Sequence, residues 1–332
     1  MTKPLVAALV GCGKMGATYV DDPLLKSYFR YASHAEVLSA HPQIDWRAAV
    51  DIDAESAKSV ATRWNVPEWS IRAADLPSRD EITFAVLAVP PGQRRAVLEQ
   101  LPALRAIILE KPLDDDDLLD LCARRGIAVQ VNLLRRADRT CRELAAGGLA
   151  ARIGLPQAAS VFYGNGICNN GIHMMDLVRM LLGEVELVSA LGPGVKTGPV
   201  VGDIQVPFAC RMASGLVVTG HPLDFGFYRE NALEIWGDNG WLGLVLEGLQ
   251  LHMAPRLSSR TTSRASELSR DASTVEATGL GEALYDMHDS LIRHVDEGAP
   301  LLSPASSAVC STAVVHAIVR SARMGGGWIK PN

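Results

Sequence analysis

Three glycines place the strongest constraint on what this chain can fold into. Gly11, Gly13 and Gly16 stand in the stretch GCGKMG, directly after the apolar run PLVAALV. An apolar run with β-branched residues that stops at glycine is typical of a strand buried on both faces. Glycines at this spacing allow a tight turn, a close approach to the backbone, and close packing of a helix on the strand. Because such turns are common, the rest of the N-terminal half must decide what this one means.

The N-terminal half alternates strand-like and helix-like segments. We expect strands within residues 4–11, 45–51, 82–91, 105–112 and 127–134, with helices within 34–42, 54–66, 93–102 and 114–126. The last of these helices begins with acids and ends with arginines, which matches the helix dipole. Alternation of this kind predicts a parallel sheet with helices on both faces. We therefore predict an α/β protein whose N-terminal domain, residues 1–125, is a Rossmann-type doubly wound sheet.

The pattern changes after roughly residue 150, where apolar residues alternate with polar ones or glycine. We predict a C-terminal α+β domain over residues 126–332, with a large, open, mostly antiparallel sheet. The Asn239-Gly240 pair favours a hairpin turn. The serine-rich segment 258–274 is predicted to be a mobile loop, and two amphipathic helices within 282–298 and 306–326 are expected to pack back on the body, with the first domain as one candidate surface. One sheet face is expected to be free, which favours a homodimer or homotetramer.

The composition excludes several classes of partner. A net charge of −5 without a basic stripe speaks against nucleic acid. The six cysteines form no CxxC pair, so neither a metal site nor a disulfide framework is expected. No uncharged apolar run reaches the roughly 20 residues that span a bilayer. With no signal-like N-terminus either, we expect a soluble, cytoplasmic protein.

At the first strand-to-helix junction, the glycine stretch predicts a dinucleotide-binding turn in which Lys14 and Met15 also border the pyrophosphate. Asp51 ends the second strand, where a carboxylate can accept hydrogen bonds from both ribose hydroxyls and repel a 2′-phosphate. NAD is therefore favoured over NADP. The acid lies beyond the roughly 20 residues usual for this fingerprint, and we attribute the excess to an insertion over residues 19–33. Asp53 competes for the same role, and a plain structural turn with a solvated aspartate is the alternative.

Several motifs together resemble one family of enzymes. They are the GxGxxG turn, the acid after the second strand, AVPP at residues 88–91, EKP at residues 110–112, and NGIHMMDLVRMLLG at residues 170–183. This combination resembles the glucose–fructose oxidoreductase, inositol dehydrogenase and rhizopine-catabolism (Gfo/Idh/MocA) family over essentially the whole chain. The resemblance implies a Rossmann domain that binds NAD and a C-terminal domain whose open sheet closes over the nicotinamide. Pro90, Pro91 and Glu110 are then expected beside the cofactor.

The resemblance also implies the catalytic residues. Lys111 matches a lysine that lies near the reacting hydroxyl or carbonyl, and a surface lysine at a turn is the alternative. Its bond to Pro112 is a candidate for the cis form, because only X-Pro bonds adopt it at modest cost. His173 matches the general acid/base, since histidine titrates near neutral pH; a core or capping histidine is the alternative. Asp176 is expected to have a structural role.

Two asparagines depart from the family pattern. Many members carry an aspartate four residues before the histidine, where this chain has Asn169. An amide hydrogen-bonds a hydroxyl but cannot take a proton. We expect Asn170 to orient the substrate within the catalytic set and Asn169 to bind it. In the stretch VNLLRR, the resemblance places Asn132 and Arg136 toward cofactor and substrate, although a solvated arginine pair is equally consistent.

We therefore expect an NAD-dependent oxidoreductase that transfers a hydride between nicotinamide and a secondary alcohol or ketone of a sugar, cyclitol or sugar derivative. The missing aspartate leaves a second interpretation open, in which the chain is a non-catalytic NAD-binding sensor or regulator. An NAD-dependent glycosidase-type enzyme is a further alternative. No metal site is expected.

Overall fold

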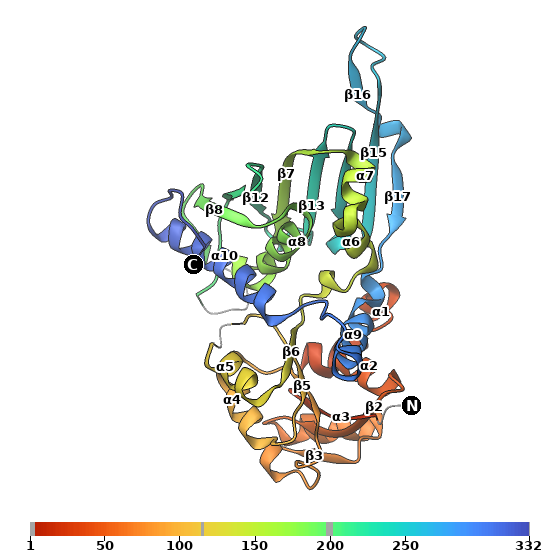
Figure 1. Cartoon of the computed structure of the whole chain (residues 1–332), viewed down its shortest axis with the longest axis vertical. Helices are drawn as coiled ribbons and strands as arrows, with labels where there is room; N and C mark the ends of the chain where they lie inside the picture. The colour runs from red at the N-terminus through yellow and green to blue at the C-terminus, as the bar shows by residue number, and fades with distance from the viewer. Residues whose placement is uncertain (1–3, 114–115, 197–201, 332) are drawn as a thin grey trace. The chain divides into compact units, whose positions relative to one another are not determined.

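A computed structural model describes residues 4–113, 116–196 and 202–331 (Figure 1). The chain divides into two compact units, each described by itself below. The first comprises Met1–Ala137 with Gly281–Ala308, and the second comprises Asp138–Leu280 with Val309–Asn332.

The first unit is built on a six-stranded sheet with the order β3-β2-β1-β4-β5-β6. Every neighbouring pair of these strands is parallel, as predicted. The central strands β1, β4 and β5 are buried along their whole length, which explains why they are continuous apolar runs. The strands are β1 (Leu5–Val10), β2 (Ile44–Val50), β3 (Glu68–Ser70), β4 (Phe84–Leu87), β5 (Ala106–Leu109) and β6 (Ala128–Val131).

Helices lie on both sides of this sheet, with α2 and α9 packed together and α4 and α5 packed together (Figure 1). The helices of this unit are α1 (Pro23–Tyr28), α2 (His34–Ala40), α3 (Ala54–Trp64), α4 (Pro91–Gln100), α5 (Asp116–Arg125) and α9 (Ala283–Glu297). Residues 114–115, where the helix of α5 was predicted to begin, lie outside the described residues. The predicted insertion at 19–33 forms a single 3-10 turn, η2 (Tyr19–Asp21), followed by α1.

The division of the chain differs from the predicted boundary between residues 125 and 126. Strand β6 lies after that boundary, yet it pairs with β5 and completes the parallel sheet. The buried Gln130 side chain of β6 donates to the main-chain oxygen of Met287 and accepts from the N–H of Ser303. Helix α9 and the segment after it therefore return to the first unit through contacts with residues more than 150 positions earlier.

The second unit contains a nine-stranded sheet with the order β16-β15-β14-β13-β7-β12-β11-β8, and β17 pairs with β15. Only the β7–β12 pair is parallel, so the prediction of a mostly antiparallel sheet is confirmed. The strands are β7 (Pro156–Tyr163), β8 (Val185–Ala190), β11 (Phe208–Met212), β12 (Val217–Pro222), β13 (Ala232–Gly237), β14 (Gly240–Val245), β15 (Gln250–Ser258), β16 (Ser266–Leu268) and β17 (Thr274–Ala277). A separate short pair is formed by β9 (Val195–Lys196) and β10 (Ile204–Gln205).

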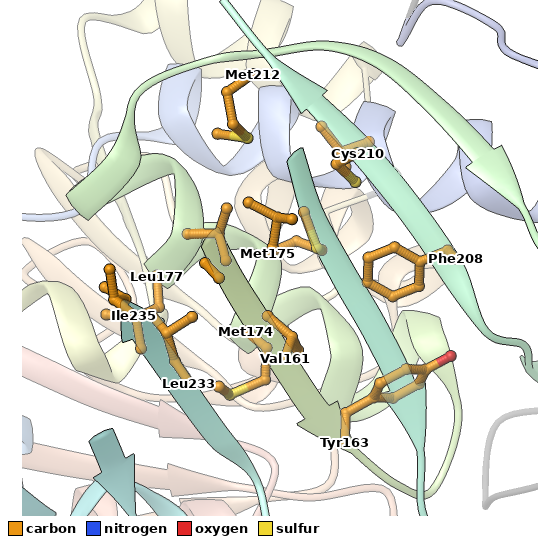
Figure 2. Packing of buried hydrophobic residues seen from close by; sticks show 14 of the residues in the cluster. Val161, Tyr163, Met174, Met175, Leu177, Phe208, Cys210, Met212, Leu233 and Ile235 are labelled. Carbon is orange, nitrogen blue, oxygen red and sulfur yellow. The ribbon is translucent and has the colours of Figure 1, made fainter. Parts of the chain in front are cut away.

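Helix α8 (Ile172–Leu182) packs its apolar side on this sheet. Figure 2 shows its Met174, Met175 and Leu177 among side chains of β7, β11 and β13. The other helices of the unit are α6 (Arg139–Glu143), α7 (Leu149–Ile153) and most of α10 (Ala305–Arg323).

Of two local predictions for this unit, one was wrong and one was confirmed. The serine-rich segment 258–274 is not a loop, because β15 continues to Ser258 and β16 returns antiparallel to it. Main-chain pairing does not depend on apolar side chains, so a polar sequence hid this hairpin. The predicted hairpin at Asn239-Gly240 is present, because β13 pairs antiparallel with β14; the two residues between the strands are Asp238 and Asn239, and Gly240 already belongs to β14.

Candidate active-site elements

The three glycines of the N-terminal turn have two different physical roles. Gly11 has a φ of 96°, and a Cβ atom there would lie 2.5 Å from the main-chain oxygen of Ala88. A Cβ atom on Gly16 would lie 2.0 Å from the oxygen of Gly11. Gly13 is different, because it is exposed and no atom lies within 4 Å of its Cβ position. Gly11 and Gly16 are therefore required by internal packing, whereas Gly13 leaves open space in which a ligand can approach the backbone.

The turn continues as one π-helical turn, η1 (Lys14–Thr18), which starts after Gly13. The oxygen of Gly13 accepts hydrogen bonds from the N–H groups of Ala17 and Thr18, at 2.7 and 3.2 Å. Lys14 is exposed and Met15 half-buried. Both residues predicted to border the pyrophosphate, Lys14 and Met15, are thus at least partly accessible to solvent.

Asp51 follows β2, and its side chain hydrogen-bonds the main chain of the glycine turn. Its Oδ2 accepts from the N–H of Cys12 at 2.7 Å, and its Oδ1 accepts from the N–H of Asp53 at 2.9 Å. Each carboxylate oxygen can accept a second hydrogen bond. Asp53, the competing candidate, caps α3 through the N–H groups of Glu55 and Ser56 and also accepts from the Ser56 hydroxyl. The geometry therefore favours Asp51 over Asp53 as a ligand of ribose hydroxyls.

The surroundings of Asp51 fit an adenosine half of a dinucleotide. Ile52 and Ile71, which follow β2 and β3, are 80% and 47% exposed. Apolar side chains beside a carboxylate suit a flat base joined to a ribose. Cys12 does not add chemistry here, because burial, with a contribution from Asp51, raises the pKa of its thiol to about 12.

Lys111 lies in a segment that is clamped through its main chain. The Lys111-Pro112 bond is cis, as the sequence suggested. Arg94 of α4, only 1% exposed, donates to three main-chain oxygens around it: Val89 at 3.1 Å, Glu110 at 2.6 Å and Pro112 at 2.9 Å. One guanidinium group thus ties the end of the β4 segment to both neighbours of Lys111.

Glu110 has an acidic side chain that is held by protein groups. Its Oε1 accepts from Asn132 Nδ2 at 2.7 Å and lies 3.0 Å from His34 Nε2. Burial by itself would raise the pKa of Glu110, but the hydrogen bonds from His34 and Asn132 and the charge of Lys111 hold that pKa below its usual value. Glu110 is therefore an ionised, half-buried anchor for the segment that carries Lys111.

The anchor extends to a second histidine. His34 Nδ1 lies 2.9 Å from Nε2 of His288, on α9. Because an ionised Glu110 can only accept, His34 carries its proton on Nε2 when neutral and accepts from His288 through Nδ1. Nδ1 of His288 then bears no proton and has no hydrogen-bond partner among the described residues. Burial, with the nearby His34 and His41, holds the pKa of His288 well below its ordinary value.

In the second unit, His173 is the accessible residue of a buried helix start. Ile172 and residues 174–179 are all buried, and His173 alone in this stretch is partly exposed. Asp176 is 1% exposed, accepts from the Ser311 hydroxyl at 2.8 Å and lies 3.7 Å from Arg179. That geometry supports a structural role for Asp176.

Asn169 and Asn170 lie in the π-helical turn η6 (Ile167–Gly171), which leads directly into α8. Both side chains are partly exposed, like that of His173. The N–H of Asn170 donates to the oxygen of Gly166 at 3.1 Å, and the N–H of Asn169 donates to Asp203 Oδ2 at 2.9 Å. The turn and the helix start thus present two amides and one imidazole in five consecutive residues.

The candidate residues fall into two sets. The first unit holds the glycine turn, Asp51, Pro90, Pro91, Glu110, Lys111, Asn132 and Arg136, and the second holds Asn169, Asn170 and His173. Within the first unit, Glu110 and Asn132 are in direct contact, Pro90 and Pro91 open α4, and the half-buried Arg136 ends the short turn η4 (Leu134–Arg136).

Sequence reasoning missed Arg94, His34, His288 and Asp203. Arg94 stands beside Arg95 in the sequence, and only burial distinguishes the two. Among the described residues, no cluster of three or more histidine, cysteine or acidic side chains is arranged to hold a metal ion. Likewise, none of the described helices has the length and apolar character needed to cross a bilayer.

Comparison with known proteins agrees with this geometry. Residues 5–133 match the model of the GFO_IDH_MocA family, described as an oxidoreductase family with an NAD-binding Rossmann fold. No curated protein matches the chain. Three solved structures share the fold over nearly the whole length. One is levoglucosan dehydrogenase in complex with NADH and levoglucosan, at 18% identity and a TM-score of 0.75, covering 99% of this chain and 100% of that one.

The second is GenD2 from gentamicin A biosynthesis in complex with NAD, at 20% identity and a TM-score of 0.72, covering 100% of this chain and 97% of that one. The third is an oxidoreductase from Agrobacterium radiobacter in complex with NAD+, L-tartaric acid and magnesium, at 17% identity and a TM-score of 0.72, covering 99% and 98%. At such identities the likeness is one of fold. The family model thus places the N-terminal domain, residues 5–133, among NAD-binding Rossmann folds of the GFO_IDH_MocA oxidoreductase family, and the solved structures extend the shared fold to the rest of the chain.

Proposed function

We propose that this protein transfers a hydride between NAD and a secondary alcohol or ketone of a sugar, cyclitol or sugar derivative. The observation that carries the proposal is the position of His173. It is the one accessible side chain in an otherwise buried helix start, and it follows a turn that presents two further polar side chains.

Bound NAD supplies the hydride acceptor. The chain supplies the binding turn, with Gly13 leaving space for the pyrophosphate and Asp51 offering a free lone pair on each oxygen for ribose hydroxyls. His173 takes the proton of the substrate hydroxyl as the hydride leaves the same carbon, and returns that proton in the reductive direction. Lys111 hydrogen-bonds the reacting oxygen, with its main chain fixed by Arg94 and by the half-buried Glu110.

The polar character of the turn supports a hydroxyl-rich substrate. Asn169 and Asn170 can each donate and accept hydrogen bonds, which suits neighbouring hydroxyl groups on a ring. The similar structures include levoglucosan dehydrogenase crystallised with levoglucosan and GenD2 from gentamicin A biosynthesis, and the first of these favours a carbohydrate-like substrate over an apolar one.

The test is reduction of NAD by the purified protein with a panel of cyclitols, aldoses, anhydrosugars and aminosugars. We expect turnover with at least one member of the panel, and loss of turnover with retention of NAD binding in His173→Ala. Stoichiometric NAD binding without turnover of any panel member would favour a sensor. Bond cleavage without net NADH would favour a glycosidase-type enzyme.

We also propose that the protein is a homo-oligomer through its large sheet and works in a reducing compartment such as the cytoplasm. Large apolar side chains stand exposed on four strands of this sheet, at Val217, Trp236, Leu257 and Val275. All six cysteines are free. Light scattering at several concentrations measures the subunit count, and a purely monomeric protein would contradict the oligomer.

A further inference from the structure

We infer that Asp203 is a positioning residue for the substrate-facing turn η6, which it holds from a distant segment of the chain. Asp203 immediately precedes β10, some 30 residues after the turn in the sequence. It is 4% exposed. Both of its oxygens are directed at main-chain amides.

The hydrogen bonds of Asp203 fix the middle of the turn. Oδ1 accepts from the N–H of Cys168 at 3.0 Å and from the N–H of Ile204 at 2.8 Å, and Oδ2 accepts from the N–H of Asn169 at 2.9 Å. A helical turn leaves its first N–H groups without partners inside the helix. An ionised carboxylate is a strong acceptor for such groups, and each charge-assisted bond is roughly twice as strong as a neutral one.

Gly166 lets the carboxylate come this close. Its φ is 93°, and a Cβ atom there would lie 2.0 Å from Asp203 Oδ2. Any other residue would therefore push the carboxylate away from the turn and strain the backbone as well. Glycine at 166 and aspartate at 203 form a matched pair.

A second contact ties the same segment to the strand that precedes the turn. The hydroxyl of the buried Tyr163, at the end of β7, donates to the oxygen of Val206 at 2.7 Å and accepts from the N–H of Val206 at 3.0 Å. Residues 203–206 are thus hydrogen-bonded both to the end of β7 and to the turn. These contacts position the segment that carries Asn169, Asn170 and His173, none of which has a carboxylate side chain.

Asp203 is 4% exposed and its two oxygens accept three main-chain N–H groups, so we assign it no contact with substrate. Its effect on turnover is indirect, through the geometry of the turn. The kinetic part of this inference rests on the proposed function, whereas its structural part does not.

The experiment compares Asp203→Asn with a matched variant, Asp238→Asn. Asp238 makes the same kind of bond at the other end of β7, where its Oδ1 accepts from the N–H of Leu155 at 3.0 Å against Gly154. The replacement at 203 keeps the side-chain shape but turns an NH₂ group toward at least one amide of the turn. Hydrogen–deuterium exchange of peptides covering residues 164–174 measures how well the main chain of the turn is protected. Steady-state kinetics and NAD titration measure the effect on kcat/KM and on the Kd for NAD.

We expect Asp203→Asn to speed exchange in this peptide at least tenfold and to lower kcat/KM at least tenfold, with the Kd for NAD within twofold of the parent. Asp238→Asn should match the parent in all three. Gly166→Ala keeps Asp203 in the sequence but displaces its carboxylate from the turn, so it should reproduce the changes through an independent substitution.

Unchanged exchange in both Asp203→Asn and Gly166→Ala would overturn the inference. So would faster exchange with unchanged kcat/KM. If the parent protein turns over no substrate, the proposed function fails, but the exchange comparison still decides whether Asp203 holds the turn.

Discussion

Nη2 of Arg94 donates a hydrogen bond of 2.6 Å to the main-chain oxygen of Glu110, the residue before Lys111. Together with the bonds to Val89 and Pro112, this contact makes one buried side chain of α4 the support of the whole lysine segment. The neighbouring Arg95 is half exposed and pairs with Glu99 on its own helix. Two adjacent arginines therefore have opposite roles.

Replacing Arg94 should destabilise the first unit and replacing Arg95 should not. Arg94→Gln leaves buried carbonyl groups unpaired, so we expect a loss of about 2–4 kcal/mol in the free energy of unfolding. Arg95→Gln removes an exposed ion pair and should change stability within measurement error. Urea unfolding of the two variants measures this. Equal losses of unfolding free energy in the two variants would mean that the three main-chain hydrogen bonds of Arg94 contribute no more to stability than the exposed Arg95.

Asp51 should decide the choice of cofactor. Its carboxylate oxygens can hydrogen-bond ribose hydroxyls and would repel a 2′-phosphate, so NAD should bind about tenfold more tightly than NADP, or about 1.4 kcal/mol. Asp51→Ala should relax this preference without unfolding the protein. Fluorescence titration with both cofactors tests the expectation, and equal affinities in the parent protein would show that Asp51 has no such role.

Loss of His173 should separate turnover from cofactor binding. We expect His173→Ala to lower kcat by about 10²–10⁴-fold, the usual range for a positioned acid/base, with NAD affinity unchanged. Lys111→Ala should lose a similar factor and bind substrate more weakly as well. Asn170→Ala should mainly raise KM. A rate that survives His173→Ala would remove the basis of the proposed mechanism.

Asn169→Asp tests whether the amide is fitted to the substrate. Restoring the acid that many relatives carry at this position adds a charge beside Asp203, whose Oδ2 already accepts from the N–H of residue 169. Two carboxylates at close range repel each other. We therefore expect a lower rate than the parent, measured as kcat at saturating NAD. A higher rate would mean that the site had merely lost a useful acid.

His288 should make the first unit less stable at mildly acidic pH. Its folded-state pKa lies well below the usual 6.5, so below that pH the unfolded chain binds a proton that the folded chain does not. Stability should then fall as pH drops from about 6.5 toward the folded pKa, by at most about 1.4 kcal/mol per pH unit for one proton. The lowered pKa of His41 acts in the same direction.

Urea unfolding between pH 7 and pH 5 measures this slope. His288→Gln should reduce it, because the variant removes one of the two histidines that stay neutral in the folded state. An identical slope in the variant would show that proton uptake on unfolding arises elsewhere.

The sequence by itself determined the elements and much of the chemistry. The apolar run before Gly11 predicted β1, and the alternation up to residue 134 predicted the parallel sheet, because strand and helix periodicities are written in consecutive residues. The glycine turn, Asp51, Lys111 and His173 were likewise recognisable, since each stands at a fixed place relative to a neighbouring strand or helix.

Only the tertiary structure decided which distant residues support them. Arg94 could not be told from Arg95, and Asp203 stands among mostly apolar residues with no motif around it. The hairpin over 258–266 was hidden, because main-chain pairing carries no side-chain signal. The return of α9 to the first unit depends on Gln130 meeting Met287 and Ser303. Contacts between residues far apart in the chain leave no local pattern, because they depend on which surfaces remain to be covered once the local elements have formed.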